Sequence, residues 1–113
     1  MKFEIKEVYH AVVFTPKGKV MGGPDTVKFH EAIKAYIGQG KKQFVVDLGN
    51  VDWMNSPGLG MLITAYTSVR NAGGDLVIAR PAEKVKSLMV ITQLERVFKS
   101  FDELDDAVKS FAG

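Results

Sequence analysis

The sequence predicts an α/β fold in which helices pack against a mixed sheet. Two nearly continuous apolar runs, QFVVDL at 43–48 and DLVIA at 75–79, are typical of strands that are buried on both faces. From residue 43 onward such strands alternate with helical patterns over short connections, which indicates parallel crossovers. A chain of 113 residues has room for one core. We therefore expect a single domain over residues 1–113.

Two strands are expected before the first helix. FEIKEV at 3–8 alternates apolar and charged residues, as a strand with one wet face does. HAVVFTP at 10–16 is a second apolar run, which Pro16 and the turn-prone PKGK are expected to end. Because the two runs are short and close, we expect them to pair antiparallel.

The next segment, GGPDTVKFHEAIKAYIGQG, predicts a helix. Pro24 suits its first turn, and Gly38 and Gly40 are expected to end it. The apolar residues on one face are Phe29, Ile33, Tyr36 and Ile37.

Residues after 48 complete the pattern with three helices and one more strand. The expected elements are a helix on Leu59, Leu62, Ile63, Tyr66 and Val69 that ends at NAGG, a helix on AEKVKSLMVI (82–91), an edge strand on RVFKSF (96–101), and a helix on DELDDAVKSFA (102–112) capped by Asp102.

The composition argues against several classes of function. The absence of cysteine excludes disulfides, thiolate zinc sites and cysteine nucleophiles. The net charge is +2 and the lysines are scattered, with only Lys41 and Lys42 adjacent, so a nucleic-acid partner is not expected. No run approaches the roughly 18 apolar residues of a membrane span, and no secretory signal is evident. We expect a cytoplasmic protein that is a monomer on its own.

No pattern in the sequence predicts an active site, a metal site or a cofactor. His10 and His30 have no ligand spacing to a carboxylate. The acidic residues of DELDD at 102–106 suit the start of a helix and lack the spacing of a calcium loop. GLG at 58–60 has neither the lysine of a Walker loop nor a third dinucleotide-loop glycine. We expect no enzyme and no cofactor.

Ser56, in the stretch DWMNSPGLGML at 52–62, has two interpretations from the residues alone. It is a good N-cap for the helix that follows. Pro57, Gly58 and Gly60 also leave the first helical turn approachable, and a helix N-terminus tolerates a phosphate. Phosphorylation there would place a charge of about −1.5 to −2 at an apolar spot and abolish docking of a partner.

Residues 44–108 resemble the STAS domains, specifically the bacterial anti-sigma factor antagonists. The family's pattern has a strand that ends in Asp-Leu, an acidic residue followed by Ser and Ser or Thr, Gly-Leu-Gly, a helix, a Gly-Gly turn, a strand, and a late Leu and Val-Phe. The residues in those places are Phe44–Leu48, Asn55–Gly60, Gly73-Gly74, Leu76–Ala79 and Leu94–Phe98. The resemblance implies the STAS fold, with a mixed sheet of about four to five strands and four helices.

The resemblance also implies a phosphorylation switch. The position that matches the family's phosphoacceptor is Ser56. In such proteins the unphosphorylated form binds a serine-kinase anti-sigma factor and frees the sigma factor, phosphorylation prevents this, and a serine phosphatase resets it. The partner supplies ATP and magnesium. Asn55 replaces the family's aspartate, Pro57 replaces its second serine or threonine, and Asp25 is nearest to its acidic residue before the first helix.

We expect the partner to dock on the Ser56 loop and the exposed side of the following helix. The expected docking residues are Met54, Asn55, Ser56, Pro57, Gly58, Leu59, Gly60, Met61 and Thr64, with Ala65 and Ser68 as further candidates on the helix. Asp47 is expected to hold the loop by hydrogen bonds, and Tyr66 to be a core aromatic. Two alternatives stay open: an unmodified STAS scaffold or transporter-associated interaction module, and a STAS domain that binds a nucleotide or lipid.

Overall fold

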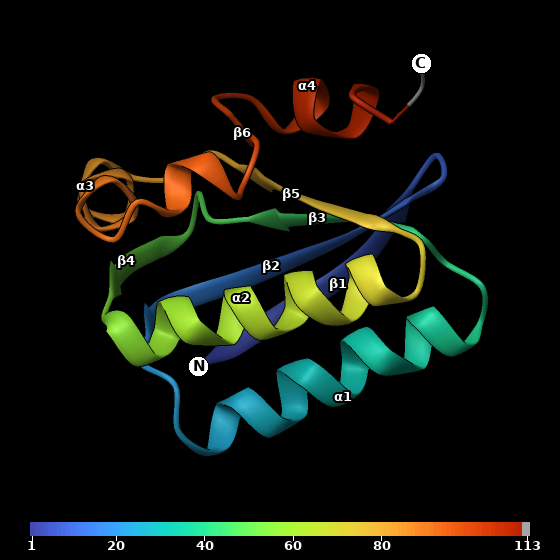
Figure 1. Cartoon of the computed structure of the whole chain (residues 1–113), viewed down its shortest axis with the longest axis horizontal. Helices are drawn as coiled ribbons and strands as arrows, with labels where there is room; N and C mark the ends of the chain where they lie inside the picture. The colour runs from blue at the N-terminus through green and yellow to red at the C-terminus, as the bar shows by residue number, and fades with distance from the viewer. Residues whose placement is uncertain (112–113) are drawn as a thin grey trace.

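The computed structural model describes residues 1–111, which form four α-helices, one 3-10 helix and a six-stranded sheet (Figure 1). In chain order the elements are β1 (Lys2–Val8), β2 (Ala11–Val20), α1 (Pro24–Gly38), β3 (Gln43–Asp47), β4 (Val51–Met54), α2 (Ser56–Asn71), β5 (Asp75–Ala79), α3 (Glu83–Ile91), η1 (Leu94–Arg96), β6 (Ser100–Phe101) and α4 (Leu104–Lys109). The α/β fold with a mixed sheet and four helices is confirmed, with one strand more than expected.

The sheet has the order β1-β2-β3-β5-β6, and β4 pairs with the end of β2. The β1–β2 pair is antiparallel, as predicted, and every other pair is parallel. The carboxyl ends of β2, β3, β4 and β5 therefore lie toward one edge of the sheet. Loops at this edge are the usual place for ligands in sheets of this kind.

Helices cover both faces of the sheet. In Figure 1, α1 and α2 lie side by side on one face, α4 lies on the other, and α3 lies beside β4. Side chains alternate between the two faces along each strand, so the core is divided into two clusters, one on each face of the sheet. Val12, Phe14 and Val46 face the larger cluster with α1 and α2, whereas Val13 and Val45 face the smaller cluster with α4.

The first helix buries the expected face. Phe29 and Ile33 are fully buried, while Tyr36 and Ile37 are partly buried against the same cluster. Of the described residues, no helix is long and apolar enough to cross a membrane.

The prediction that Pro16 ends the second strand is wrong, because β2 continues to Val20. Pro16 pairs only with Phe3 of β1. It lies between Phe14, the last residue paired with β3, and Gly18, the first paired with β4. A proline is tolerated there because no strand on that side needs its missing N–H.

Strand β4 was not predicted from the sequence. Its pairing with β2 shifts register at Gly18/Lys19, so that Asp52 is an extra residue in the ladder. Such a bulge turns two consecutive residues to the same side. Asp52 and Trp53 are accordingly both exposed between the buried Val51 and Met54, and the alternation typical of a strand is lost.

The chain after α3 departs from the prediction in two details. The expected edge strand at 96–101 contains only β6, since Leu94–Arg96 forms a 3-10 helix and residues 97–99 are irregular. Asp102 does not cap the last helix: Glu103 occupies the N-cap position without a side-chain hydrogen bond, and Asp102 binds Lys86 at 3.3 Å. Position 112 of the expected helix lies outside the described residues.

Candidate functional site

The start of α2 is capped by Asn55, not by Ser56. Asn55 has an extended backbone, and its Oδ1 accepts a hydrogen bond of 2.8 Å from the Gly58 backbone N–H. Ser56 is the first helical residue, and Pro57 follows it in the first turn, where a missing N–H is not needed. The prediction that Ser56 caps the helix is therefore wrong, and its hydroxyl is not used for capping.

Gly58 lets the helix start approach the end of β2. A Cβ at this position would lie 2.0 Å from the Val20 carbonyl oxygen, a distance that no side chain can adopt. The Asn55 N–H also donates to the same oxygen at 3.4 Å. Backbone contact between α2 and β2 thus fixes where Ser56 lies.

Ser56 is exposed, and few N–H groups remain free beside it. Pro57 has none, Gly58 donates to the Asn55 side chain, and Leu59 donates to the Asn55 carbonyl at 3.0 Å. Within residues 1–111 only the N–H of Ser56 itself has no partner in this turn. An anion on Ser56 would therefore gain the positive potential of the helix end and little direct hydrogen bonding.

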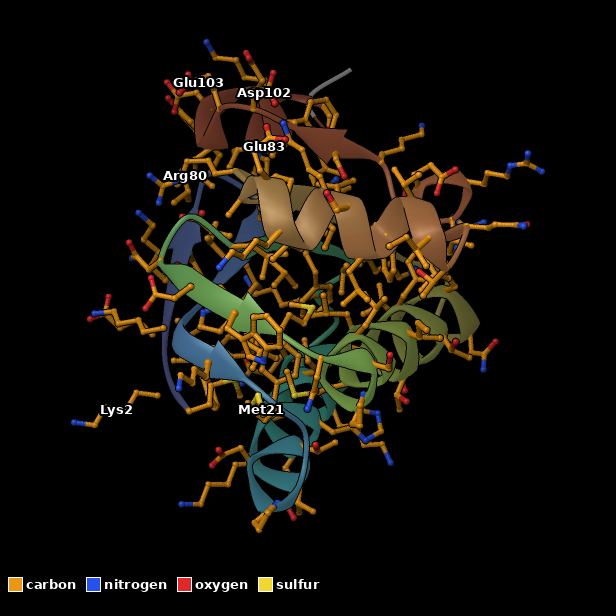
Figure 2. The ribbon with its side chains drawn as sticks, turned by 90° about the vertical axis from the view of Figure 1, so that its left-hand side faces the viewer. Lys2, Met21, Arg80, Glu83, Asp102 and Glu103 are labelled. Atoms are coloured by element: carbon orange, nitrogen blue, oxygen red, sulfur yellow. The ribbon has the colours of Figure 1, made fainter. Side chains whose placement is uncertain are left out.

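The loop between β2 and α1 lies against the start of α2. A Cβ on Gly22 would contact the Pro57 Cβ at 3.0 Å, and Gly22 has a φ of 79° that favours glycine. The preceding residue, Met21, is 46% exposed. Figure 2 shows it at the surface between the end of β2 and the start of α1. The expected docking set did not include this loop. The Gly-Gly-Pro sequence indicates a turn but does not indicate which residues the turn contacts.

Only part of the expected docking set is accessible. Ser56, Pro57 and Thr64 are exposed, and Asn55 and Gly60 are half-buried. The placement of Met61 and Ala65 on the exposed side of the helix is wrong, because both face the core. The buried members of the set are Met54, Gly58, Leu59, Met61 and Ala65.

Ser68 faces α1 rather than solvent. Its Oγ lies 2.8 Å from Nε2 of His30, so this half-buried pair joins the two helices. Partial burial, and then the charge of Lys34, lower the pKa of His30. The two residues serve the α1–α2 contact.

Asp47 holds the β3–β4 loop. Only 2% exposed, it accepts hydrogen bonds from the Gly49 N–H at 3.0 Å and from Nε and Nη2 of Arg80 at 2.9 and 2.7 Å. This paired geometry, first through the hydrogen bonding to Asp47, raises the pKa of Arg80. Asp47 therefore forms loop-holding hydrogen bonds, but with the β3–β4 loop and not with the expected Ser56 loop.

A cavity of about 870 Å³ lies away from Ser56. It is bounded by the β1–β2 hairpin, the Asp47–Arg80 pair and the start of α4. Figure 2 shows Arg80 and Glu103 on this side of the molecule. Its charges are of both signs and the Arg80 guanidinium is already paired, so no ligand class stands out.

The two aromatic residues near the site differ in exposure. Tyr66 packs edge-on against Phe98, with ring centroids 5.2 Å apart, as a core aromatic. Trp53 is 43% exposed, and the Lys84 Nζ lies 6.0 Å from its ring centroid.

Comparison with known proteins gives a family match over nearly the whole chain. The family model described as STAS domain matches residues 2–107. A relative from Thermotoga neapolitana, named "Putative anti-sigma factor antagonist TM1081 homolog", is 27% identical over 78 residues, 69% of each chain.

Solved structures show the same fold. An anti-sigma factor antagonist from Mycobacterium paratuberculosis superposes with a TM-score of 0.83 at 20% identity, covering 99% of this chain and 94% of its own. The anti-sigma factor antagonist SpoIIAA in its unphosphorylated form gives 0.83 at 17%, covering 99% and 97%. The phosphorylated form of SpoIIAA, the Bacillus cell fate determinant, gives 0.76 at 15%, covering 97% and 99%.

Proposed function

Because the chain belongs to the STAS domain family, we propose that it is an anti-sigma factor antagonist controlled at Ser56. The unphosphorylated form binds a serine-kinase anti-sigma factor and so frees a sigma factor. Phosphorylation of Ser56 ends this binding, and a serine phosphatase restores it.

The observation that carries the proposal is the placement of the Ser56 hydroxyl. It is exposed at the first residue of a 16-residue helix, and Asn55 performs the capping in its place. The neighbouring residues are small or rigid, so a kinase active site can approach the hydroxyl without meeting a bulky side chain of α2. A serine whose hydroxyl was the cap would be less available.

The transfer requires only the acceptor from this chain. The Ser56 Oγ forms a bond to the γ-phosphorus of ATP as the bond from that phosphorus to the leaving ADP oxygen breaks. The hydroxyl proton passes to a base of the kinase, and ADP leaves. ATP, magnesium and the base belong to the partner.

A phosphate on Ser56 acts by charge and bulk. It adds about −1.5 to −2 charges at neutral pH, and the first turn of α2 can offer it only the N–H of Ser56. The phosphate therefore stays at the surface, where the partner must dock, and the fold is left unchanged. SpoIIAA has this fold in both its unphosphorylated and its phosphorylated form, which supports a change confined to the surface.

The test is intact-mass spectrometry after incubation with ATP and each purified serine-kinase anti-sigma factor of the source organism. We expect a gain of one phosphate in the wild type and in Ser68→Ala, whose hydroxyl is engaged by His30. Ser56→Ala should show no gain. A gain that persists in Ser56→Ala, or no gain with any kinase, would refute the acceptor assignment.

A further inference from the structure

An apolar groove of about 440 Å³ lies between β4 and α3, next to the Ser56 turn. Figure 2 shows α3 running alongside β4 on this face, with Glu83 at the start of the helix. The lining residues are Trp53, Met54, Glu83, Lys84, Ser87, Leu88 and Ile91.

Two large apolar side chains of the groove are left in contact with water. Trp53 is 43% exposed and Ile91 is 78% exposed. The bulge in β4 is what turns Trp53 outward. Exposed apolar side chains that gather at a concave place mark interaction surfaces, and tryptophan is the residue type most enriched in binding hot spots.

The groove is lined by two charged side chains, Glu83 and Lys84. Glu83 lies 3.9 Å from Lys86, a lysine that also pairs with Asp102 at 3.3 Å, whereas Lys84, beside the Trp53 ring, has no carboxylate within ion-pair distance among the described residues. Two exposed residues of opposite charge lie just outside the groove. Lys19 is the register partner of Trp53 on the neighbouring strand, and Asp52 precedes Trp53 in the chain, so their charges offset each other. The complementary occupant is a bulky apolar side chain with a carboxylate nearby.

We propose that this groove binds a second segment of the same anti-sigma factor that docks at Ser56, a segment that carries a large apolar side chain and an acidic residue. The inference rests on the proposed function. Trp53 and Ser56 are three residues apart, so the chain allows at most about 10 Å between their Cα atoms. One partner can therefore cover both places.

A partner segment in the groove would also be repelled by a phosphate on Ser56. The bound of about 10 Å between the Trp53 and Ser56 Cα atoms is comparable to the Debye length, about 8 Å at physiological salt, so a phosphate on Ser56 would act on acidic residues of a partner segment that contacts Trp53. The phosphate then repels the segment that Lys84 attracts. Release of the partner follows from electrostatic repulsion at the groove as well as from bulk at the turn.

The groove can be tested with a matched pair of variants on the last turn of α3. Ile91→Ser removes an exposed apolar side chain that lines the groove, and Val90→Ser removes one that is 59% exposed and lies outside the lining. Binding of the full chain to the purified anti-sigma factor is measured by calorimetry. We expect Ile91→Ser, Trp53→Ala and Lys84→Glu each to weaken binding about ten-fold or more, and Val90→Ser to leave it unchanged.

Trp53 provides a direct spectroscopic readout because it is the only tryptophan of the chain. With 5-fluorotryptophan incorporated, the single ¹⁹F resonance should shift when the anti-sigma factor is added. No shift, or equal affinities for Ile91→Ser and Val90→Ser, would overturn the groove. If Ser56→Asp still abolished binding in that case, the proposed function would stand without it, whereas failure of the wild type to bind any anti-sigma factor would overturn both.

Discussion

Gly58 provides a stringent test of how α2 is positioned, because alanine at this residue has no room. The new Cβ would lie 2.0 Å from the Val20 carbonyl oxygen and 2.7 Å from its carbonyl carbon. Contacts between carbon and a carbonyl oxygen normally occur at about 3.3 Å, so the helix start would have to move by roughly 1.3 Å. The atoms that it meets are backbone atoms of a strand and cannot rotate away.

Gly60, two residues later in the same helix, is the matched control. A Cβ there would meet nothing within 4 Å. Alanine should stabilise the helix by about 0.5–1 kcal/mol at either position through its lower conformational entropy. The difference between the two variants therefore isolates the contact with Val20, and overpacking of this kind costs about 1–3 kcal/mol.

The assay is urea unfolding of both variants and the wild type. We expect Gly60→Ala to be slightly more stable than the wild type and Gly58→Ala to be less stable than Gly60→Ala by about 2 kcal/mol, with equal m values. Gly58→Ala should also weaken partner binding, because the turn that bears Ser56 moves with the helix. Equal stability of the two variants would refute the described contact between α2 and β2.

Two further predictions concern the fold near the site. Asp47→Ala should lower the free energy of unfolding by about 2 kcal/mol in a urea titration, because the Gly49 N–H and Arg80 lose a buried acceptor while the half-exposed guanidinium regains water; an unchanged midpoint would contradict this. His30 has a pKa below its ordinary value of about 6.5, through partial burial and then Lys34, so the folded state favours the neutral ring. Its contribution to stability is complete above about pH 6.5 and is lost as the pH falls from that value through the lower pKa of the folded state. Unfolding at about pH 7.5 and 5.5 should show a smaller loss for His30→Gln than for the wild type, and an equal loss would refute the assignment.

Most of the fold could be predicted because its signals are local. The buried strands β3 and β5 and the apolar faces of α1 and α2 depend on patterns within ten to fifteen residues. Strand β4 and the continuation of β2 past Pro16 could not be predicted, since both depend on which strand lies beside β2 at each residue. Neither a bulge nor a change of the strand that pairs with β2 produces a periodic pattern in the sequence.

Only part of the candidate site could be predicted from the sequence, for the same reason. The sequence locates Ser56 at the start of a helix, but only the Asn55 hydrogen bond to Gly58 shows which residue caps it. Met61 was likewise expected on the exposed side of α2. It is buried because two neighbouring faces of the helix are covered, one by α1 and one by the sheet, and helical spacing alone does not show this. The close approach of Gly22 to Pro57 joins a loop and a helix start that are 35 residues apart, and it has no signature in either segment.

Under the proposed switch, phosphate on Ser56 decides whether the partner binds. The most direct measurement is the dissociation constant of the anti-sigma factor for the unphosphorylated chain and for the chain phosphorylated at Ser56, under the same salt concentration. We expect tight binding of the first and a loss of at least about a hundred-fold for the second, with both forms equally folded by circular dichroism. Equal dissociation constants for the two forms would contradict the switch and indicate a binding module that phosphorylation does not control.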